Sequence, residues 1–253
     1  MTDSPNITSR SWLMVGLLGL VWGSTFMFIE LALRGITPFW LAAGRISFAA
    51  ALTCVIWALR GAPLFQDRPA NKDWLRLMGI GALSSAVPFM LISWGQQFTT
   101  AGFAGVSMAS VALIVLPLAH VLVPGERMIP RRVGGFVVGF LGVVVLVGPD
   151  ALTATGAEGE TLGRLACVTA AGCYAISSIN LRQLPPVDPL GLSAMTLVFG
   201  TVIVLTAAWM VEGPPPLPDR DTFLVLALLW LVSTAGANFL RTLVARPAAP
   251  ASL

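Results

Sequence analysis

Residues 12–59 decide the fold of this chain: WLMVGLLGLVWGSTFMFIELALRGITPFWLAAGRISFAAALTCVIWAL. The stretch holds two apolar runs of about 20 residues, and each is long enough to cross the roughly 30 Å hydrocarbon core of a bilayer as a helix. A short turn at residues 34–38 joins them. Each run carries one full charge, Glu30 in the first and Arg45 in the second. The hairpin is therefore predicted to place two charges within the membrane.

The composition of the 253-residue chain indicates the same environment. Hydrophobic residues make up 56% of it and charged residues 11%, which leaves too little polar surface to coat a soluble globule of this size. The net charge of +3 comes from basic residues that lie between apolar runs, whereas a nucleic-acid site needs them gathered on one face. The cysteines at positions 54, 167 and 173 all fall within apolar runs and indicate neither disulfides nor a metal site. An integral membrane protein without a nucleic-acid partner is predicted.

Eight apolar spans follow one another along the chain. Their length favours helices, because a barrel strand needs only about 10 residues and shows an in–out alternation that is absent here. The predicted fold class is all-α, a multi-span membrane helix bundle. The spans cover residues 12–33, 38–59, 74–98, 101–123, 133–148, 162–183, 189–211 and 222–245.

The distribution of Lys and Arg predicts the orientation of these spans. If the N-terminus is cytoplasmic, eleven of the fifteen Lys and Arg residues lie on the inner side and three on the outer side, with Arg45 in the membrane. Cytoplasmic loops carry the excess of positive charge. A multi-pass protein with a cytoplasmic N-terminus is therefore expected.

The chain also contains an internal repeat. The pattern P-x2-L-x-A-x4-F starts at Pro38 and again 151 residues later at Pro189, and W-x3-G-x-P starts at Trp57 and again at Trp209. The repeat unit holds five spans, an odd number, so its second copy enters the membrane from the opposite side. Many secondary transporters use such inverted repeats for alternating access.

The second copy is predicted to be incomplete. We expect a first five-helix repeat over residues 12–149 and a second, with three helices, over residues 162–253, so that about eight spans of an expected ten are present. Two functions from different classes remain open. One is a secondary transporter. The other is a non-transporting truncated membrane protein, or a subunit that needs another chain to complete the bundle.

Four short features follow one another along nearly the whole chain. They are W-G-S-T at residues 22–25, Arg45, a small-residue run from Ala101 into Leu116-Pro117-Leu118, and Gly125-Glu126-Arg127 before a glycine-rich span. In this order, together with the five-span duplication, they resemble the EamA-type transporters of the drug/metabolite transporter superfamily.

The resemblance implies a permease of the bacterial inner membrane with ten helices in two inverted halves. Such a permease moves small metabolites, for example amino acids or related compounds. Its expected partners are the lipid bilayer, a small-molecule substrate, and a proton or another coupling ion, with a homodimer as an open alternative to a monomer. No cofactor is expected, and because nothing in the sequence binds ATP, the driving force is an ion or substrate gradient.

Glu30 and Arg45 are the first candidates for the substrate or ion pathway. A charge at mid-helix costs about 2.5–3.5 kcal/mol on insertion scales, so each needs a partner or water. In an antiparallel hairpin that turns at Gly35, the long Arg45 side chain can lean outward toward Glu30. Two interpretations stay open: a structural ion pair, or a gating or binding pair in which Arg45 meets a carboxylate and Glu30 meets an amine or a proton. By the repeat, Glu30 corresponds to Arg182 and Arg45 to Thr196, so the pair was not duplicated. This favours a role for the two charges that only the first repeat has.

Five other polar residues are candidates for the same pathway, each with a structural alternative. Gln96 and Gln97 close the third span, where they are either interfacial or part of the pathway. His120, the sole histidine, is either interfacial or a proton relay. Asn180 and Asn238 either hydrogen-bond across helices or contact substrate.

Helix breaks and small residues complete the set. Pro88 and Pro117 each remove a backbone donor, which either kinks a packed helix or frees carbonyls toward a cavity. Trp22 and Thr25 are assigned to the pathway by the family resemblance. Two G-x3-G pairs, at residues 19–23 and 135–139, are predicted to let helices pack closely.

An enzymatic site is not predicted. The sequence has no His-rich or acid-rich cluster typical of a metal site and no glycine loop after a strand that would cradle a phosphate. Ser107 has no triad partner beyond His120. No catalytic residue is therefore assigned.

Overall fold

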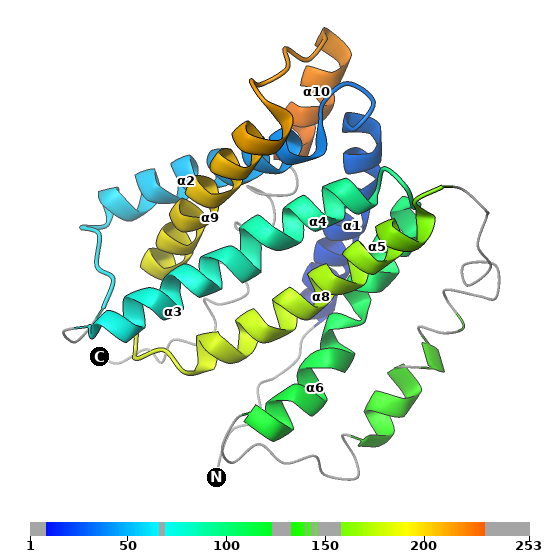
Figure 1. The fold of residues 1–253 in the computed structure, drawn as a ribbon. Coiled ribbons are helices and arrows are strands. Elements are labelled where there is room, and N and C mark those ends of the chain that lie inside the picture. The colour runs from blue at the N-terminus through cyan, green and yellow to red at the C-terminus, as the bar shows by residue number, and fades with distance from the viewer. Residues whose placement is uncertain are drawn as a thin grey trace.

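The computed structural model describes residues 9–65, 69–122, 133–139, 141, 142, 145 and 158–230, and this part of the chain is built of helices (Figure 1). Its only β-type pairing among these residues is a single bridge between Phe65 and Val187. The predicted all-α fold class is confirmed. Within the described residues, five helices are long and apolar enough to cross a membrane, and they cover Pro38–Leu59, Asn71–Gly95, Ala101–Leu122, Glu160–Arg182 and Pro189–Glu212.

The elements follow the predicted order closely. Residues before 123 form α1 (Ser9–Ala32), α2 (Pro38–Leu59), α3 (Asn71–Gly81), the π-helical turn η1 (Ala82–Ala86), α4 (Val87–Gly95), α5 (Ala101–Ala109) and α6 (Val111–Leu122). Residues 133–139 are also helical. The later part forms α8 (Glu160–Arg182), α9 (Pro189–Glu212) and α10 (Arg220–Leu229). Asn238 and the later parts of the fifth and eighth predicted spans lie outside the described residues.

Helix ends coincide with residues that satisfy or terminate the backbone. Proline stands at the first position of α2 and of α9, where its missing N–H is not needed. The Asp188 carboxylate accepts hydrogen bonds from the backbone N–H of Leu190 (3.0 Å) and of Gly191 (2.8 Å). Beyond the last residue of α9, Gly213 has a φ of 77°, a conformation that favours glycine. Such local closure matters here, because lipid offers no partner to a free backbone group.

The third span contains an irregular turn in front of Pro88. Pro88 has no N–H with which to bond the carbonyl four residues earlier, and just before it the Val87 N–H donates to the Ala82 carbonyl across a π turn. The Ser85 hydroxyl donates to the Gly81 carbonyl at 2.6 Å. Pro88 itself is buried, so this helix break lies inside the bundle, whereas Pro117 lies on an exposed part of α6.

Three of the contacts between helices join the earlier part of the chain to the later part. α2 lies along α9, α1 contacts α10, and the α3–α4 span packs against α8 (Figure 1). α2 and α9 are antiparallel, because Glu212 at the end of α9 bonds the start of α2, and the Asp188 N–H before α9 donates to the Leu64 carbonyl beyond α2 at 2.8 Å. We call these two ends of the bundle the Glu212 end and the Asp188 end.

Close helix approach depends on two glycines that the sequence did not single out. A Cβ added to Gly95 of α4 would lie 2.8 Å from the Gly163 carbonyl oxygen of α8, and one added to Gly163 would lie 2.8 Å from the Gly95 oxygen. Added at Gly19 or Gly23, it meets no atom of the described structure within 4 Å. The described residues therefore do not test the packing role predicted for the 19–23 pair, which stays a prediction.

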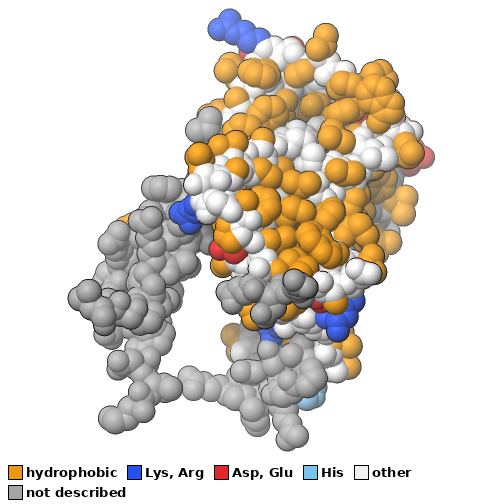
Figure 2. All heavy atoms as spheres, turned by 90° about the vertical axis from the view of Figure 1, so that its left-hand side faces the viewer, with side chains coloured by type: hydrophobic (Ala, Val, Ile, Leu, Met, Phe, Trp, Pro, Cys, Tyr) orange, Lys and Arg blue, Asp and Glu red, His pale blue; other side chains and the backbone are white. Residues whose placement is uncertain are grey.

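Large apolar side chains cover the outside of the bundle, as expected for a surface in contact with lipid. Leu59, Met210 and Val211 are among those that are strongly exposed. Figure 2 shows hydrophobic side chains spread continuously over the middle of one face, with charged side chains mainly toward its edges. The described fold and its surface are those of a multi-pass membrane protein.

Candidate functional site

Arg45 lies at the centre of the candidate site. It belongs to α2, its side chain is only 7% exposed, and its guanidinium carbon lies 4.5 Å from the ring centroid of Phe89 on α4. The Tyr174 hydroxyl on α8 is within electrostatic reach of the same group. Arg45, Phe89 and Tyr174 are called the Arg45 site below. A guanidinium over an aromatic face gains a cation–π attraction that strengthens when water is excluded.

The charge of Arg45 is not neutralised by the described residues. Its Nε atom is buried and donates no hydrogen bond among them, and it forms no ion pair with a described Asp or Glu. A buried charge without a partner is costly, so such residues mark functional sites more often than structural ones. Arg45 was identified from the sequence, but Phe89, whose ring it contacts, was not.

The ion pair between Glu30 and Arg45, one of the two predicted interpretations, is not present in the described structure. Glu30 is exposed and its carboxylate accepts a hydrogen bond from the Ala101 N–H, 3.2 Å away, at the first residue of α5. A carboxylate there also complements the positive end of the helix dipole. The reason is geometric: Glu30 faces α5, and Arg45 points toward α4 and α8 instead of back along the hairpin.

A row of three residues along α4, the last two of them polar, leads from the Arg45 site toward the Glu212 end. Phe89, Ser93 and Gln96 are spaced by four and three residues and therefore share one face of the helix. Ser93 is fully buried and Gln96 is 5% exposed. The Gln96 amide donates to the Phe26 carbonyl at 2.9 Å, whereas its oxygen and the Ser93 hydroxyl have no hydrogen-bond partner among the described residues. Gln96 is thus buried with its amide oxygen unbonded among these residues, while Gln97 is exposed.

The other predicted pathway residues do not converge on this row. Trp22 is 60% exposed, and Thr25, one helical turn further on, is buried with its hydroxyl bonded to the Val21 carbonyl at 2.9 Å. His120 is exposed near the end of α6, and Asn180 is half-buried near the end of α8.

Trp230, the residue after the end of α10, packs against α2 beside Arg45 in sequence. A Cβ on Gly44, the neighbour of Arg45 in sequence, would lie 3.0 Å from the Trp230 ring, which also stacks on Phe48 with centroids 5.7 Å apart. The Trp230 N–H is buried without a partner among the described residues. Phe89, Tyr174 and Trp230 were missed by sequence analysis. Tyr174 alone offered a signal, as the sole tyrosine of the chain.

A second group of contacts joins α2 to α9 at the Glu212 end. The Glu212 carboxylate accepts hydrogen bonds from the N–H groups of Phe39 (2.8 Å) and Trp40 (3.1 Å) and from the Thr37 hydroxyl. The Trp40 indole donates to the Gly213 carbonyl at 3.1 Å. We call these residues the Glu212 clamp. The carboxylate of one helix thus caps the N-terminus of the other, where the dipole favours negative charge.

We expect Glu212→Ala to destabilise the bundle, because it removes the acceptor for two backbone N–H groups. Loss of a capping side chain costs about 0.5–2 kcal/mol, which lowers the melting temperature of a chain of this size by roughly 1–8 °C. Thermal unfolding in detergent measures the shift. Glu158→Ala, in the exposed turn before α8, is the control. Equal melting temperatures for the two variants would show that the clamp contributes nothing to stability.

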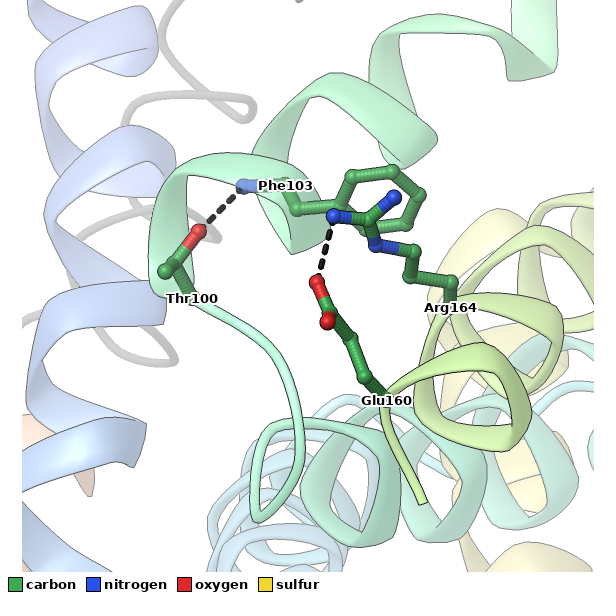
Figure 3. Close-up of polar contacts among 4 residues, drawn as sticks. All are labelled: Thr100, Phe103, Glu160 and Arg164. Atoms are coloured by element: carbon green, nitrogen blue, oxygen red, sulfur yellow. Dashed lines mark hydrogen bonds and ion pairs between the residues drawn. The ribbon is translucent and has the colours of Figure 1, made fainter. Parts of the chain in front are cut away.

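A charged cluster at the same end joins α5 to α8 (Figure 3). Arg164 pairs with Glu160 one turn earlier on α8, and its guanidinium carbon lies 5.2 Å from the Phe103 ring centroid. The Thr100 hydroxyl accepts a hydrogen bond from the Phe103 N–H at 3.2 Å. The cluster therefore holds the start of α5 against α8. It shares no residue with the Arg45 site.

An open depression of about 550 Å³ lies between the α1–α2 turn and the start of α10. Arg34, Asp219 and Asp221 are among its lining residues. Hydrogen bonding to the Thr222 side chain lowers the pKa of Asp219, which keeps this carboxyl charged at the N-terminus of α10.

The fold and the buried Arg45 site define a helical membrane protein with an internal polar site. Comparison with known sequences identifies the family: residues 10–148 match the EamA-like transporter family, and the chain belongs to it. The resemblance seen in the sequence is thereby confirmed.

Individual relatives are distant. An uncharacterized transporter of Archaeoglobus fulgidus is 24% identical over 76% of this chain and 65% of its own length. A protein of Streptantibioticus cattleyicolor named as a probable terminal-alkyne amino-acid exporter is 29% identical over 55% of this chain and 45% of its own length. A solved crystal structure superposes with a TM-score of 0.65 at 20% identity, covering 92% of this chain and 79% of that one, which supports the fold.

Proposed function

We propose that this chain is a permease that moves small metabolites, such as amino acids or related compounds, across a membrane by alternating access. The observation that carries the proposal is Arg45, a buried cation that lies between α2, α4 and α8 and has no carboxylate bonded to it within the described residues. Ionisable residues inside a membrane bundle mark substrate and ion pathways. The family and the transporter named among the relatives support the same class of function.

The helix contacts support the proposed inverted repeat. In the proposed division into residues 12–149 and 162–253, α1, α2 and α3–α4 correspond to α8, α9 and α10. For three of the helix contacts, exchanging the two sets has a simple result. The α1–α10 contact becomes the contact between α8 and α3–α4, and the α2–α9 contact remains the α2–α9 contact. A two-fold axis in the membrane plane has this effect. Rocking of the two halves about the Arg45 site is the proposed transport step.

The proposed orientation places the Glu212 end outside. It follows from the excess of Lys and Arg on the other side of the bundle, and it belongs with a bacterial inner membrane and a cytoplasmic N-terminus. The Glu212 clamp then holds α2 and α9 together at the outer end, and the row formed by Phe89, Ser93 and Gln96 leads from the Arg45 site toward it. We propose an ion or substrate gradient as the driving force.

Counterflow in proteoliposomes tests the proposal. Vesicles that contain the purified chain are loaded with one unlabelled metabolite from a panel, and uptake of the same labelled compound is followed. We expect uptake to be saturable and to exceed that of protein-free vesicles for at least one compound. Uptake equal to that of protein-free vesicles across amino acids, other carboxylates and amines would contradict a transport function for this chain.

A further inference from the structure

The distribution of acidic residues bears on which substrates the Arg45 site accepts. Every described Asp and Glu lies in the first or last turn of a helix or in a connection between helices. Glu30 lies in the last turn of α1 and bonds the start of α5. Residues 231–253 contain no Asp or Glu at all. Arg45, the eighth residue of a 22-residue helix, therefore faces no counter-charge from these parts of the chain.

The immediate surroundings of Arg45 favour an anion that carries an apolar body. The guanidinium carbon lies 4.5 Å from the centroid of the Phe89 ring, and the N–H groups of a guanidinium point outward in its plane. Among these, Nε is buried and unbonded within the described residues. A carboxylate binds a guanidinium through two parallel N–H bonds, the geometry that Arg provides and Lys does not.

One aromatic ring contacts this cation, and two others come from neighbouring helices. Phe89 and Tyr174 come from α4 and α8, and Trp230 lies against Gly44 beside Arg45. Such rings bind apolar and aromatic groups, and the cation that the Phe89 ring faces is already Arg45. An ammonium group brought to this site would meet the Arg45 charge and no carboxylate from the described helices.

We propose that the Arg45 site selects a small monocarboxylate with an apolar or aromatic body and no ammonium group, in preference to the corresponding amino acid. The proposal rests on the proposed transport function, and it narrows the substrate to net anions. Arg45 supplies the carboxylate contact, and Phe89, Tyr174 and Trp230 supply the surface for the apolar body.

Four ligands with one aromatic body and different charges test this selectivity. They are 3-phenylpropionate (anion), phenylalanine (zwitterion), phenethylamine (cation) and 3-phenylpropanol (neutral). Binding to the full chain in phosphatidylcholine nanodiscs is measured by tryptophan fluorescence. We expect 3-phenylpropionate to bind at least about tenfold more tightly than phenylalanine, which is about 1.4 kcal/mol, and the cation to bind least well. Equal or tighter binding of phenylalanine would overturn the proposal.

Two variants identify the group responsible. In Arg45→Met, the preference for the anion over the neutral alcohol should disappear. In Arg45→Lys, which keeps the charge but not the planar donor pair, a preference for the anion over the cation should remain, with weaker binding. Arg60→Met, at the exposed end of the same helix, should bind as the unchanged chain does. An unchanged anion preference in Arg45→Met would show that the selectivity arises elsewhere and would overturn the proposal.

Counterflow with the same four ligands separates this proposal from the transport function. Flux of 3-phenylpropionate above that of phenylalanine supports both. Flux that favours phenylalanine leaves the transport function standing and overturns the anion selectivity. Selective, Arg45-dependent binding of 3-phenylpropionate without any flux supports the selectivity of the site and contradicts transport.

Discussion

Arg45→Ala is expected to abolish substrate-dependent flux in proteoliposomes while the chain still inserts into the membrane. Truncating one partner of a buried, hydrogen-bonded charge pair costs about 2–5 kcal/mol, or roughly 30-fold to several-thousand-fold in affinity. In the proposed site the partner is the substrate carboxylate, so the loss falls on substrate recognition. Insertion should not suffer, because removing a charge from a span relieves a cost of about 2.5–3.5 kcal/mol.

Flux and membrane content are measured on the same preparations. Arg60→Ala is the matched control, since it removes an exposed arginine at the end of the same helix. Arg45→Lys should retain part of the flux. If Arg45→Ala is inserted normally and transports as the unchanged chain does, Arg45 has no role in the pathway, and the proposal built on it fails.

The second large effect is expected at the crossing of α4 and α8. Gly163→Ala places a Cβ 2.8 Å from both the Gly95 carbonyl oxygen and the Phe98 Cβ. These atoms cannot move aside as the end of a flexible side chain can, so the two helices must separate. Overpacking of this kind costs about 1–3 kcal/mol, which lowers the melting temperature in detergent by roughly 2–12 °C.

The matched control lies on the same helix. Gly172→Ala adds its Cβ where no atom of the described structure lies within 4 Å, and Ala is favoured over Gly in a helix by up to about 1 kcal/mol. We therefore expect opposite signs, with Gly163→Ala less stable and Gly172→Ala unchanged or more stable. If both variants melt at the same temperature, the α4–α8 crossing does not depend on close backbone approach.

The candidate site was only partly predictable from the sequence. Arg45 was found because a charged side chain within an apolar span is rare, since placing it in the membrane costs free energy. Phe89 and Trp230 were not, because the chain has thirteen Phe and eight Trp and nothing in their local sequence separates one that touches a cation from one that faces lipid. The predicted alternative of a Glu30–Arg45 ion pair was wrong for the described structure, since sequence distance within a hairpin does not say toward which neighbour each side chain points.

The sequence by itself determined the all-α, multi-span class and the bounds of helices such as α2, predicted and observed at residues 38–59. These properties are local: apolar length sets the span, and proline, glycine and capping residues set its ends. Only the tertiary structure decided that Arg45 lies over Phe89 and that Glu212 caps α2. Those contacts depend on how each helix is rotated and how it crosses its neighbours, which the packing of the whole bundle determines.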